Sequence, residues 1–244
     1  MIQAVFAAFA LLTRVPVPAR FSTGADLGRA VGFFPLVGLL LGLGAMGMAA
    51  GLAGHLPPAV AATGVVALLA AVTGALHLDG VADLFDGLAG GRGDRARVLD
   101  IMRDSRIGSA GAVAVVLVLA AKIAAIAALI DARDFLPLLV SPVVARWAVT
   151  PQVVLFPTAR AEGLGHGFRA GARGRDLAIA TVLLAAVGFA SGGAIIVQQA
   201  AASLFVSLVI GVWLRVRLGG LTGDVYGATI EIAEVLALSV ALLS

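Results

Sequence analysis

Residues 110–130 read AGAVAVVLVLAAKIAAIAALI, an apolar run in which Lys122 is the one charged side chain. A helix needs about 20 consecutive apolar residues to cross the hydrocarbon core of a bilayer. Further apolar runs near that length lie at 31–54, 58–76, 135–156, 177–197, 201–218 and 225–244. The chain is therefore expected to form an all-α, polytopic integral membrane bundle of about seven transmembrane helices, as a single domain over residues 1–244.

The composition of the 244-residue chain agrees with this expectation, because 61% of the residues are hydrophobic and only 13% are charged. A soluble domain is typically about 45–50% apolar and about 25% charged. Cysteine is absent, so the chain holds neither disulfides nor thiolate metal sites. These values exclude a soluble enzyme, a disordered chain and a disulfide scaffold.

The first apolar segment, residues 1–15, is shorter than the others. Its large apolar side chains fall on one helical face, at Ile2, Val5, Phe6, Phe9 and Leu12. A helix of this length does not span a bilayer comfortably. We therefore expect an interfacial or re-entrant helix here.

The arginines predict the orientation of the bundle. With the seven spans above, fourteen of the 17 basic residues fall on one side of the membrane: Arg14, Arg20, Arg29, Arg92, Arg95, Arg97, Arg103, Arg106, Arg160, Arg169, Arg173, Arg175, Arg215 and Arg217. The other side carries only Arg133. Cytoplasmic loops are enriched in Lys and Arg. This asymmetry predicts a bacterial-type cytoplasmic (inner) membrane protein with a cytoplasmic N-terminus and an outside C-terminus. Lipid is the expected surrounding partner, a homo-oligomer stays open, and no nucleic-acid partner is expected.

Small residues four positions apart allow helices to approach closely in membranes. Three such pairs predict helix–helix contacts: Gly38 with Gly42, Gly47 with Gly51, and Gly188 with Gly192.

The charged residues concentrate in residues 77–109, where Asp79, Asp83 and Asp86 have helical spacing i, i+4, i+7. At 3.6 residues per turn these carboxylates share one face, and they repel each other unless a cation lies between them. Carboxylate oxygens are ligands that Mg²⁺ prefers. We therefore predict a cytoplasmic Mg²⁺ site, with Gly80 and Gly87 leaving room for a ligand. A solvated polar face of a loop helix is the alternative.

The end of this segment, residues 103–106, places Asp104 and Ser105 between Arg103 and Arg106. Arginines facing a metal-bound diphosphate would stabilise the charge that develops in phosphoryl transfer. A basic anchor at the membrane surface is the alternative.

A third polar segment, residues 219–228, reads GGLTGDVYGA and contains Thr222 and Asp224. A glycine-rich turn exposes backbone N–H groups that can hold an anion. Glu231 lies deeper in the same apolar run, and Arg146 and Lys122 are its candidate partners. Both a substrate role and a structural ion pair between helices fit Glu231 and Arg146. The arginine-rich loop 157–176 is a candidate cover for a polar substrate.

Residues 77–91, 101–111 and 217–234 resemble, in order, the signature blocks of the cobalamin synthase family, the adenosylcobinamide-GDP ribazoletransferases. Shorter resemblances lie at 11–18, 32–42, 145–147 and 162–168. The resemblance implies a membrane enzyme that joins adenosylcobinamide-GDP to α-ribazole, or its 5′-phosphate, and releases GMP with Mg²⁺ as cofactor.

The resulting hypothesis gives each candidate residue a role. The metal ligands are Asp79, Asp83 and Asp86, with Asp104 as a further candidate. Arg103 and Arg106 stabilise the transferred phosphoryl group and the leaving GMP, and Asp104 or Asp224 takes the proton of the attacking ribose hydroxyl. The expected substrate-binding residues are His77, Ser105, Arg146, Thr222 and Glu231.

Three other functions stay open on the sequence. Asp79, Asp83 and Asp86 are similar to the aspartate motif of CDP-alcohol phosphotransferases, although Asp83 replaces an arginine of that motif. Asp79 and Asp83 also resemble the diphosphate motif of membrane prenyltransferases. A transporter would instead line a path with Glu231, Arg146 and Lys122, but the chain shows no internal repeat.

Overall fold

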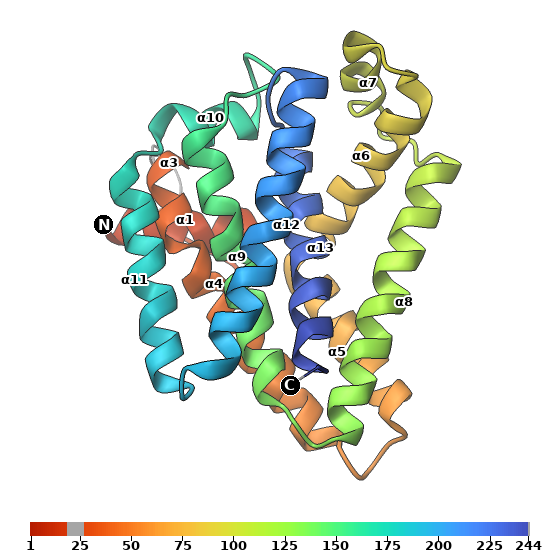
Figure 1. The fold of residues 1–244 in the computed structure, drawn as a ribbon, viewed down its shortest axis with the longest axis vertical. Helices are drawn as coiled ribbons and strands as arrows, with labels where there is room; N and C mark the ends of the chain where they lie inside the picture. The colour runs from red at the N-terminus through yellow and green to blue at the C-terminus, as the bar shows by residue number, and fades with distance from the viewer. Residues whose placement is uncertain (19–26, 244) are drawn as a thin grey trace.

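The computed structural model describes residues 1–18 and 27–243, which form helices and no strand. Figure 1 shows most of the long helices running side by side along the long axis of the molecule. The elements are α1 (Ile2–Leu12), α3 (Leu27–Ala30), η1 (Val31–Phe33), α4 (Phe34–Leu52), α5 (Pro58–Thr73), α6 (Leu76–Gly91), α7 (Arg95–Ile101), α8 (Ser109–Asp131), α9 (Leu136–Leu155), α10 (Leu164–Gly171), α11 (Gly174–Ala190), α12 (Ala194–Leu218) and α13 (Gly223–Ala241). The expected all-α membrane bundle is confirmed.

Fewer than the expected seven helices are long and apolar enough to span a membrane. In the described chain, four stretches are long and apolar enough to cross a membrane: Leu27–Leu52, Ser109–Asp131, Leu136–Leu155 and Ile195–Leu218. The consecutive helices α5 and α6 make a fifth if they count as one bent span. Helix α11 has only 17 residues, and α13 carries three acidic side chains. The count of seven is therefore not confirmed.

A sharp bend separates α5 from α6. Gly74 and Ala75 both have left-handed backbone angles, with φ of +62° and +57°. The two helices consequently meet at 89° instead of continuing as one rod. Residues 77–91, expected in a polar cytoplasmic segment, therefore form a helix that packs within the bundle against α8 and α13.

The arginine-rich segments gather at one end of the bundle. In Figure 1, α7, α10 and the connection from α12 to α13 lie at the upper end, and the α8–α9 connection lies at the lower end. Arg133 belongs to that lower connection. Arg20 lies outside the described residues. This arrangement has the asymmetry on which the predicted orientation rests, while the orientation itself stays a prediction.

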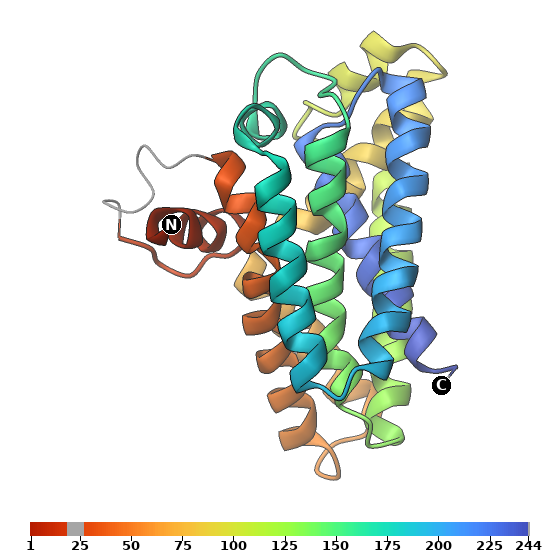
Figure 2. The same ribbon diagram turned by 60° about the vertical axis from the view of Figure 1, so that its left-hand side comes forward.

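Helix α1 lies across the bundle, and Figure 2 shows it nearly end-on beside helices seen along their length. Its 11 residues are about half of what a membrane span requires. Helix α1 is therefore too short to span the membrane, in agreement with the sequence-based expectation.

The boundary between α11 and α12 differs from the expected one. The expected spans 177–197 and 201–218 put this boundary at residues 198–200. The chain instead turns at Gly192 and Gly193, which have φ of +84° and +86°. Gln199 lies inside α12, fully buried, and its side-chain amide donates to the Ala237 carbonyl at 3.0 Å. A buried hydrogen bond between helices thus makes a polar residue acceptable in mid-helix.

The glycine pairs differ in what they do. A Cβ at Gly38 or Gly42 would collide with the backbone of α9, at Pro142 and Leu139 respectively, so this pair brings α4 against α9. The prediction for Gly47 and Gly51 is wrong, because a Cβ at either meets nothing within 4 Å in the described chain.

The two glycines of the third pair, Gly188 and Gly192, have different roles. A Cβ at Gly188 would lie 2.9 Å from the Ile196 side chain, so this glycine does serve the packing of α11 on α12. Gly192 instead forms the turn between these helices.

The expectation that Gly80 and Gly87 leave room for a ligand is also wrong. A Cβ on Gly80 would lie 2.6 Å from the Asp224 carbonyl oxygen, and one on Gly87 would lie 3.0 Å from the Val98 carbonyl oxygen. Both spaces are filled by neighbouring helices, α13 and α7. From the other side, Gly227 of α13 faces the backbone of His77. The glycines therefore bring α6 and α13 together, and this contact places the aspartates of α6 beside Asp224.

We expect Gly80→Ala to lower both thermal stability and enzymatic activity. Its methyl group forces α6 and α13 apart, and overpacking of this kind typically costs about 1–3 kcal/mol. The matched control is Gly47→Ala, whose methyl group meets no atom within 4 Å. Thermal unfolding in detergent should show a lower midpoint for Gly80→Ala only. Equal midpoints for both variants would contradict the close packing of α6 on α13.

Candidate functional site

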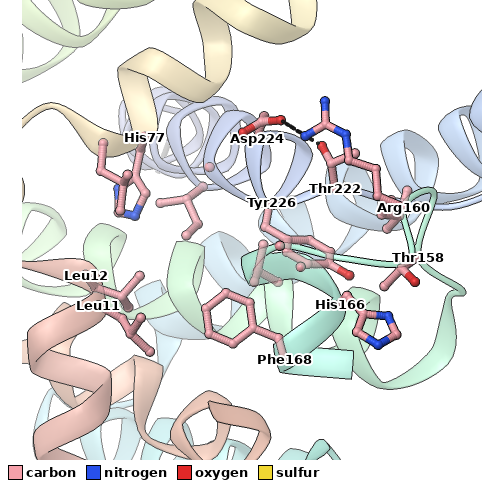
Figure 3. A pocket seen from close by; sticks show the side chains of 18 of the residues that line it. Leu11, Leu12, His77, Thr158, Arg160, His166, Phe168, Thr222, Asp224 and Tyr226 are labelled. Atoms are coloured by element: carbon pink, nitrogen blue, oxygen red, sulfur yellow. Dashed lines mark hydrogen bonds and ion pairs between the residues drawn. The ribbon is translucent and has the colours of Figure 1, made fainter. Parts of the chain in front are cut away.

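A cavity of about 190 Å³ lies where α1, α6, α10 and the start of α13 meet (Figure 3). One part of its wall is polar and includes Asp79, Thr158, Arg160, Thr222 and Asp224. The other part is apolar and comes from leucine, valine, isoleucine and phenylalanine side chains of five helices: Leu11, Leu12, Phe34, Val149, Phe168 and Ile230. The cavity therefore offers charge at one side and an apolar surface at the other.

Asp224 is held at the start of α13 by two neighbours. Arg160 Nη1 donates to Asp224 Oδ2 at 3.3 Å, and the Thr222 hydroxyl donates to the same oxygen at 3.2 Å (Figure 3). Thr222 is also the N-cap of α13, since its hydroxyl accepts from the Val225 N–H. Arg160 in turn donates to the Leu99 carbonyl at 3.0 Å. The carboxylate, the hydroxyl and the guanidinium thus form one connected group at the cavity wall.

The loop that carries Arg160 is fixed to the segment before α13 by two backbone hydrogen bonds. Leu221 N–H donates to the Pro157 carbonyl, and Ala159 N–H donates to the Leu221 carbonyl, both at 2.9 Å. Gly220 has no room for a Cβ, because the backbone of Thr158 lies against it. The glycine-rich segment 219–223 therefore serves this close backbone pairing in the structure.

Asp79 and Asp83 of α6 lie near Asp224 and carry the same charge. Asp83 is repelled by Asp79, Asp224 and Asp86, and Arg160 is the cation that attracts it. Among the described residues, no three His, Asp or Glu side chains are close enough to hold a metal ion by themselves. Mg²⁺ usually needs only one or two protein carboxylates, because it keeps waters and takes substrate phosphates as further ligands. The donor set at this wall fits such an ion.

Asp86 points to a different partner. Its two carboxylate oxygens accept from the backbone N–H groups of Gly108 and Gly111, at 2.6 and 2.8 Å. These groups lie at the start of α8, where N–H groups have no partner within the helix. Asp86 therefore joins α6 to the N-terminus of α8, and its role as a metal ligand stays a prediction.

The segment 103–106 lies just before α8, and none of its residues lines the cavity. Asp104 is paired with Arg106, whose Nη2 lies 2.6 Å from its Oδ2. Hydrogen bonds from the Arg106 side chain and backbone lower the pKa of Asp104 to about 2. A carboxyl group with so low a pKa is a weak base. The catalytic roles of Arg103, Asp104 and Arg106, and substrate binding by Ser105, stay predictions.

A buried ionic network lies behind the cavity. Lys122 Nζ of α8 donates to Glu231 Oε2 at 2.6 Å and lies 3.0 Å from Glu234 Oε1. Arg146 Nη1 of α9 donates to Glu234 Oε2 at 2.6 Å. Two cations and two carboxylates thus balance in the interior, as buried charges require. The partners that the sequence offered for Glu231 include the correct one, Lys122, while Arg146 binds Glu234.

His77 connects this network to the cavity. It lines the cavity wall, and its Nδ1 lies 3.9 Å from Glu231 Oε1. The ring is buried, and neither nitrogen has a hydrogen-bond partner in the described chain. Of the five residues predicted to bind substrate, His77 and Thr222 line the cavity, whereas Arg146 and Glu231 form the network behind it and Ser105 lies elsewhere.

The profile of the cobalamin-5-phosphate synthase family matches residues 4–242. The chain belongs to this family. Among its relatives, the adenosylcobinamide-GDP ribazoletransferase of Geotalea daltonii is 41% identical over 239 residues, which cover 98% of this chain and 96% of the relative. The enzyme of the same name from Syntrophobacter fumaroxidans is 43% identical over 96% of this chain and 94% of its own. No solved structure matches the chain.

Membership of the cobalamin-5-phosphate synthase family agrees with the resemblance seen in the sequence. The structure adds site residues that the sequence analysis did not single out. Arg160, Thr158, His166, Phe168 and Tyr226 all line the cavity. Four of them, all but Tyr226, lie in the loop 157–176 that the sequence indicated as a candidate substrate cover, and the resemblance of residues 162–168 to the family also pointed to His166 and Phe168. The sequence analysis also did not identify the ion pairs of Glu234, because its partners come from α8 and α9.

Proposed function

We propose that this protein joins adenosylcobinamide-GDP to α-ribazole, or to α-ribazole 5′-phosphate, and releases GMP in the last step of cobalamin assembly. The names of the relatives supply the reaction. The structural observation that supports this reaction is the polar wall of the cavity, which includes Asp79, Asp224, Arg160 and Thr222. Paired carboxylates next to a guanidinium suit the transfer of a phosphoryl group from a diphosphate.

The reaction exchanges one phosphorus–oxygen bond for another. A ribose hydroxyl oxygen of α-ribazole bonds to the phosphorus on the cobinamide side of the diphosphate. The bond from that phosphorus to the bridging oxygen breaks, and GMP leaves with this oxygen. The proton of the attacking hydroxyl goes to a carboxylate of the protein.

Asp224 is the carboxylate that suits this proton transfer. It lines the cavity, and Thr222 and Arg160 fix its orientation through one oxygen, Oδ2. The other oxygen, Oδ1, has no hydrogen bond to the described residues, so it is free to accept a proton. Asp104, the alternative base, is engaged by Arg106 and lies outside the cavity lining.

Arg160 is placed to stabilise the charge of the leaving phosphate. Its guanidinium is only partly exposed and already lies beside Asp224, at 3.3 Å. In a site shielded from water, a fixed positive group of this kind stabilises developing negative charge more than it would in solution.

Mg²⁺ bound at Asp79 and Asp83, next to Asp224, would neutralise the diphosphate and polarise its phosphorus. The charges support this part of the proposal, because Asp79, Asp224 and Asp86 repel Asp83 and a bound cation would reduce that repulsion.

The proposed location is the cytoplasmic membrane, with the cavity on the cytoplasmic side and lipid around the bundle. The gathering of the arginine-rich segments at one end supports this orientation. Assembly of this protein into a homo-oligomer stays an open part of the proposal.

The direct test incubates the purified protein with adenosylcobinamide-GDP and α-ribazole and measures GMP and the corrinoid product by chromatography. Both products should form in equal amounts and only when both substrates are present. GMP release without α-ribazole would indicate a hydrolase and would contradict the proposal.

Removal of divalent metal should abolish product formation, and added Mg²⁺ should restore it. Asp83→Asn should raise the Mg²⁺ concentration for half-maximal rate by about 10- to 100-fold, the typical effect of weakening a metal site. The control is Asp94→Asn, which changes the N-cap of α7. The measurement is the initial rate against free Mg²⁺. An unchanged Mg²⁺ dependence in Asp83→Asn would exclude this residue from the metal site.

A further inference from the structure

The cavity lining contains buried polar atoms without a partner among the described residues, which are the ring nitrogens of His77 and the hydroxyl of Tyr226. Tyr226 lies on α13 and is only 4% exposed, and its hydroxyl has no hydrogen bond in the part of the chain that the structure describes. Figure 3 shows the Tyr226 ring in the middle of the lining, with its hydroxyl on the side of His166 and Thr158. A buried hydroxyl without a partner costs free energy. Its position therefore suggests a partner on a ligand.

The surroundings of this hydroxyl suit a flat aromatic group. Phe34 and Phe168 lie edge to face, with ring centroids 5.7 Å apart, and both line the cavity. Leu11 and Leu12 of α1 line it as well. Aromatic and aliphatic walls with a small number of polar groups are typical of small-molecule sites, and walls of this kind suit a planar ring system.

The size of the cavity limits which part of a substrate enters it. Its volume of about 190 Å³ lies below the about 300–1,000 Å³ of pockets that enclose whole drug-sized ligands. One ring system fits, whereas a corrin ring does not. The two substrates of the proposed reaction offer two such ring systems: the guanine of the donor and the base of α-ribazole.

Hydrogen bonding distinguishes these two bases. Guanine carries several donors and acceptors along its edges, and burying them without partners is costly. The dimethylbenzimidazole base of α-ribazole is apolar except for one ring nitrogen, which accepts a single hydrogen bond. Tyr226 offers one hydroxyl donor, and the apolar side chains of Phe34, Phe168 and Ile230 line the same cavity.

We propose that the apolar side of the cavity binds the base of α-ribazole, with the Tyr226 hydroxyl donating a hydrogen bond to its free ring nitrogen. The ribose then extends toward the polar wall, where its hydroxyl reaches Asp224. This inference rests on the proposed function and adds the site and the recognition of the acceptor. It makes Tyr226 a substrate-binding residue and α1 a part of the active site.

The test compares the wild type with Tyr226→Phe, which removes only an oxygen atom that has no hydrogen-bond partner among the described residues. The variant should therefore fold and unfold like the wild type. Its KM for α-ribazole should rise about 3- to 10-fold, the usual effect of losing one hydrogen bond, while its KM for adenosylcobinamide-GDP stays unchanged.

A modified acceptor makes the test specific. In the α-riboside of 5,6-dimethylindole, a C–H group replaces the ring nitrogen. The wild type and Tyr226→Phe should have equal KM values for this compound, because neither forms the hydrogen bond. A remaining difference would mean that Tyr226 acts in another way and would overturn the proposal.

Other outcomes separate this inference from the proposed function. A change in the KM for adenosylcobinamide-GDP alone would assign the cavity to the donor, and an unchanged KM for α-ribazole would remove Tyr226 from acceptor binding. Calorimetric titration with α-ribazole alone tests the subsite without turnover. If the wild type binds α-ribazole more tightly than Tyr226→Phe but forms no product, the proposed reaction fails while the subsite stands.

Discussion

Asp224→Asn is expected to lose product formation by about 100- to 10,000-fold, the range typical of removing a group that transfers a proton in the transition state. Asparagine has the same shape, so the hydrogen bonds from Thr222 and Arg160 to the side-chain oxygen can persist. The negative charge and the ability to accept a proton are lost. The loss should therefore appear in kcat, measured as GMP release at saturating concentrations of both substrates.

The matched control for this variant is Asp134→Asn, which removes an exposed aspartate beside the α8–α9 connection, at the opposite end of the bundle. Both variants should be present in the membrane at wild-type amounts, as measured by immunoblot. If Asp224→Asn retained a kcat within about twofold of the wild type, Asp224 could not be the proton acceptor. Asp104, the alternative base, would then be the next carboxylate to test.

The second large effect is expected for Lys122→Met, which should lower the free energy of unfolding by about 3–5 kcal/mol. Lys122 is 3% exposed and neutralises Glu231 and Glu234. Its removal leaves Arg146 as the one cation that contacts these two carboxylates, so a negative charge stays buried without compensation. The measurement is the unfolding midpoint in detergent, together with the folded fraction on size-exclusion chromatography.

A double variant tests whether charge balance is the cause. Lys122→Met combined with Glu231→Gln removes one charge of each sign and leaves the Arg146–Glu234 pair intact. It should be more stable than Lys122→Met alone. The exposed Arg215→Met serves as a control for loss of a cation and should unfold like the wild type. If the double variant were no more stable than Lys122→Met, packing of the lysine stem would explain the loss better than charge.

The network also has a consequence for the interpretation of acidic residues in apolar helices. Glu231 and Glu234 lie in α13 at positions where an ionised side chain is costly, and the sequence offered both a substrate role and a structural role for Glu231. The structure shows a balanced set of ion pairs among α8, α9 and α13. His77, which faces both Glu231 and the cavity, connects this set to the candidate site.

The three aspartates of α6 show that helical spacing predicts a shared face but not shared partners. Their spacing placed them on one face, but Asp86 is turned to the start of α8, where two backbone N–H groups bind it. Asp79 instead lines the cavity. Side chains on one face of a helix can thus have different partners, because different elements lie along the length of that face.

The sequence by itself determined the fold class, most helix positions and the segments in which the charged residues concentrate. The reason is that the bilayer demands long apolar helices, and the few charges that remain are confined to places that tolerate or use them. The family also followed from the sequence, since it rests on local blocks of residues.

Only the tertiary structure decided which of these polar residues meet. Residues 79, 160 and 224 are far apart in the chain, and their proximity depends on the contact of Gly80 with α13 and on the backbone pairing of Leu221 with the loop of Arg160. The bend at Gly74 and Ala75, which brings α6 into the bundle, depends on backbone angles that composition and periodicity do not reveal. A cavity likewise exists only once helices have packed, so Tyr226 could be recognised as a binding residue only from its unpartnered hydroxyl inside it.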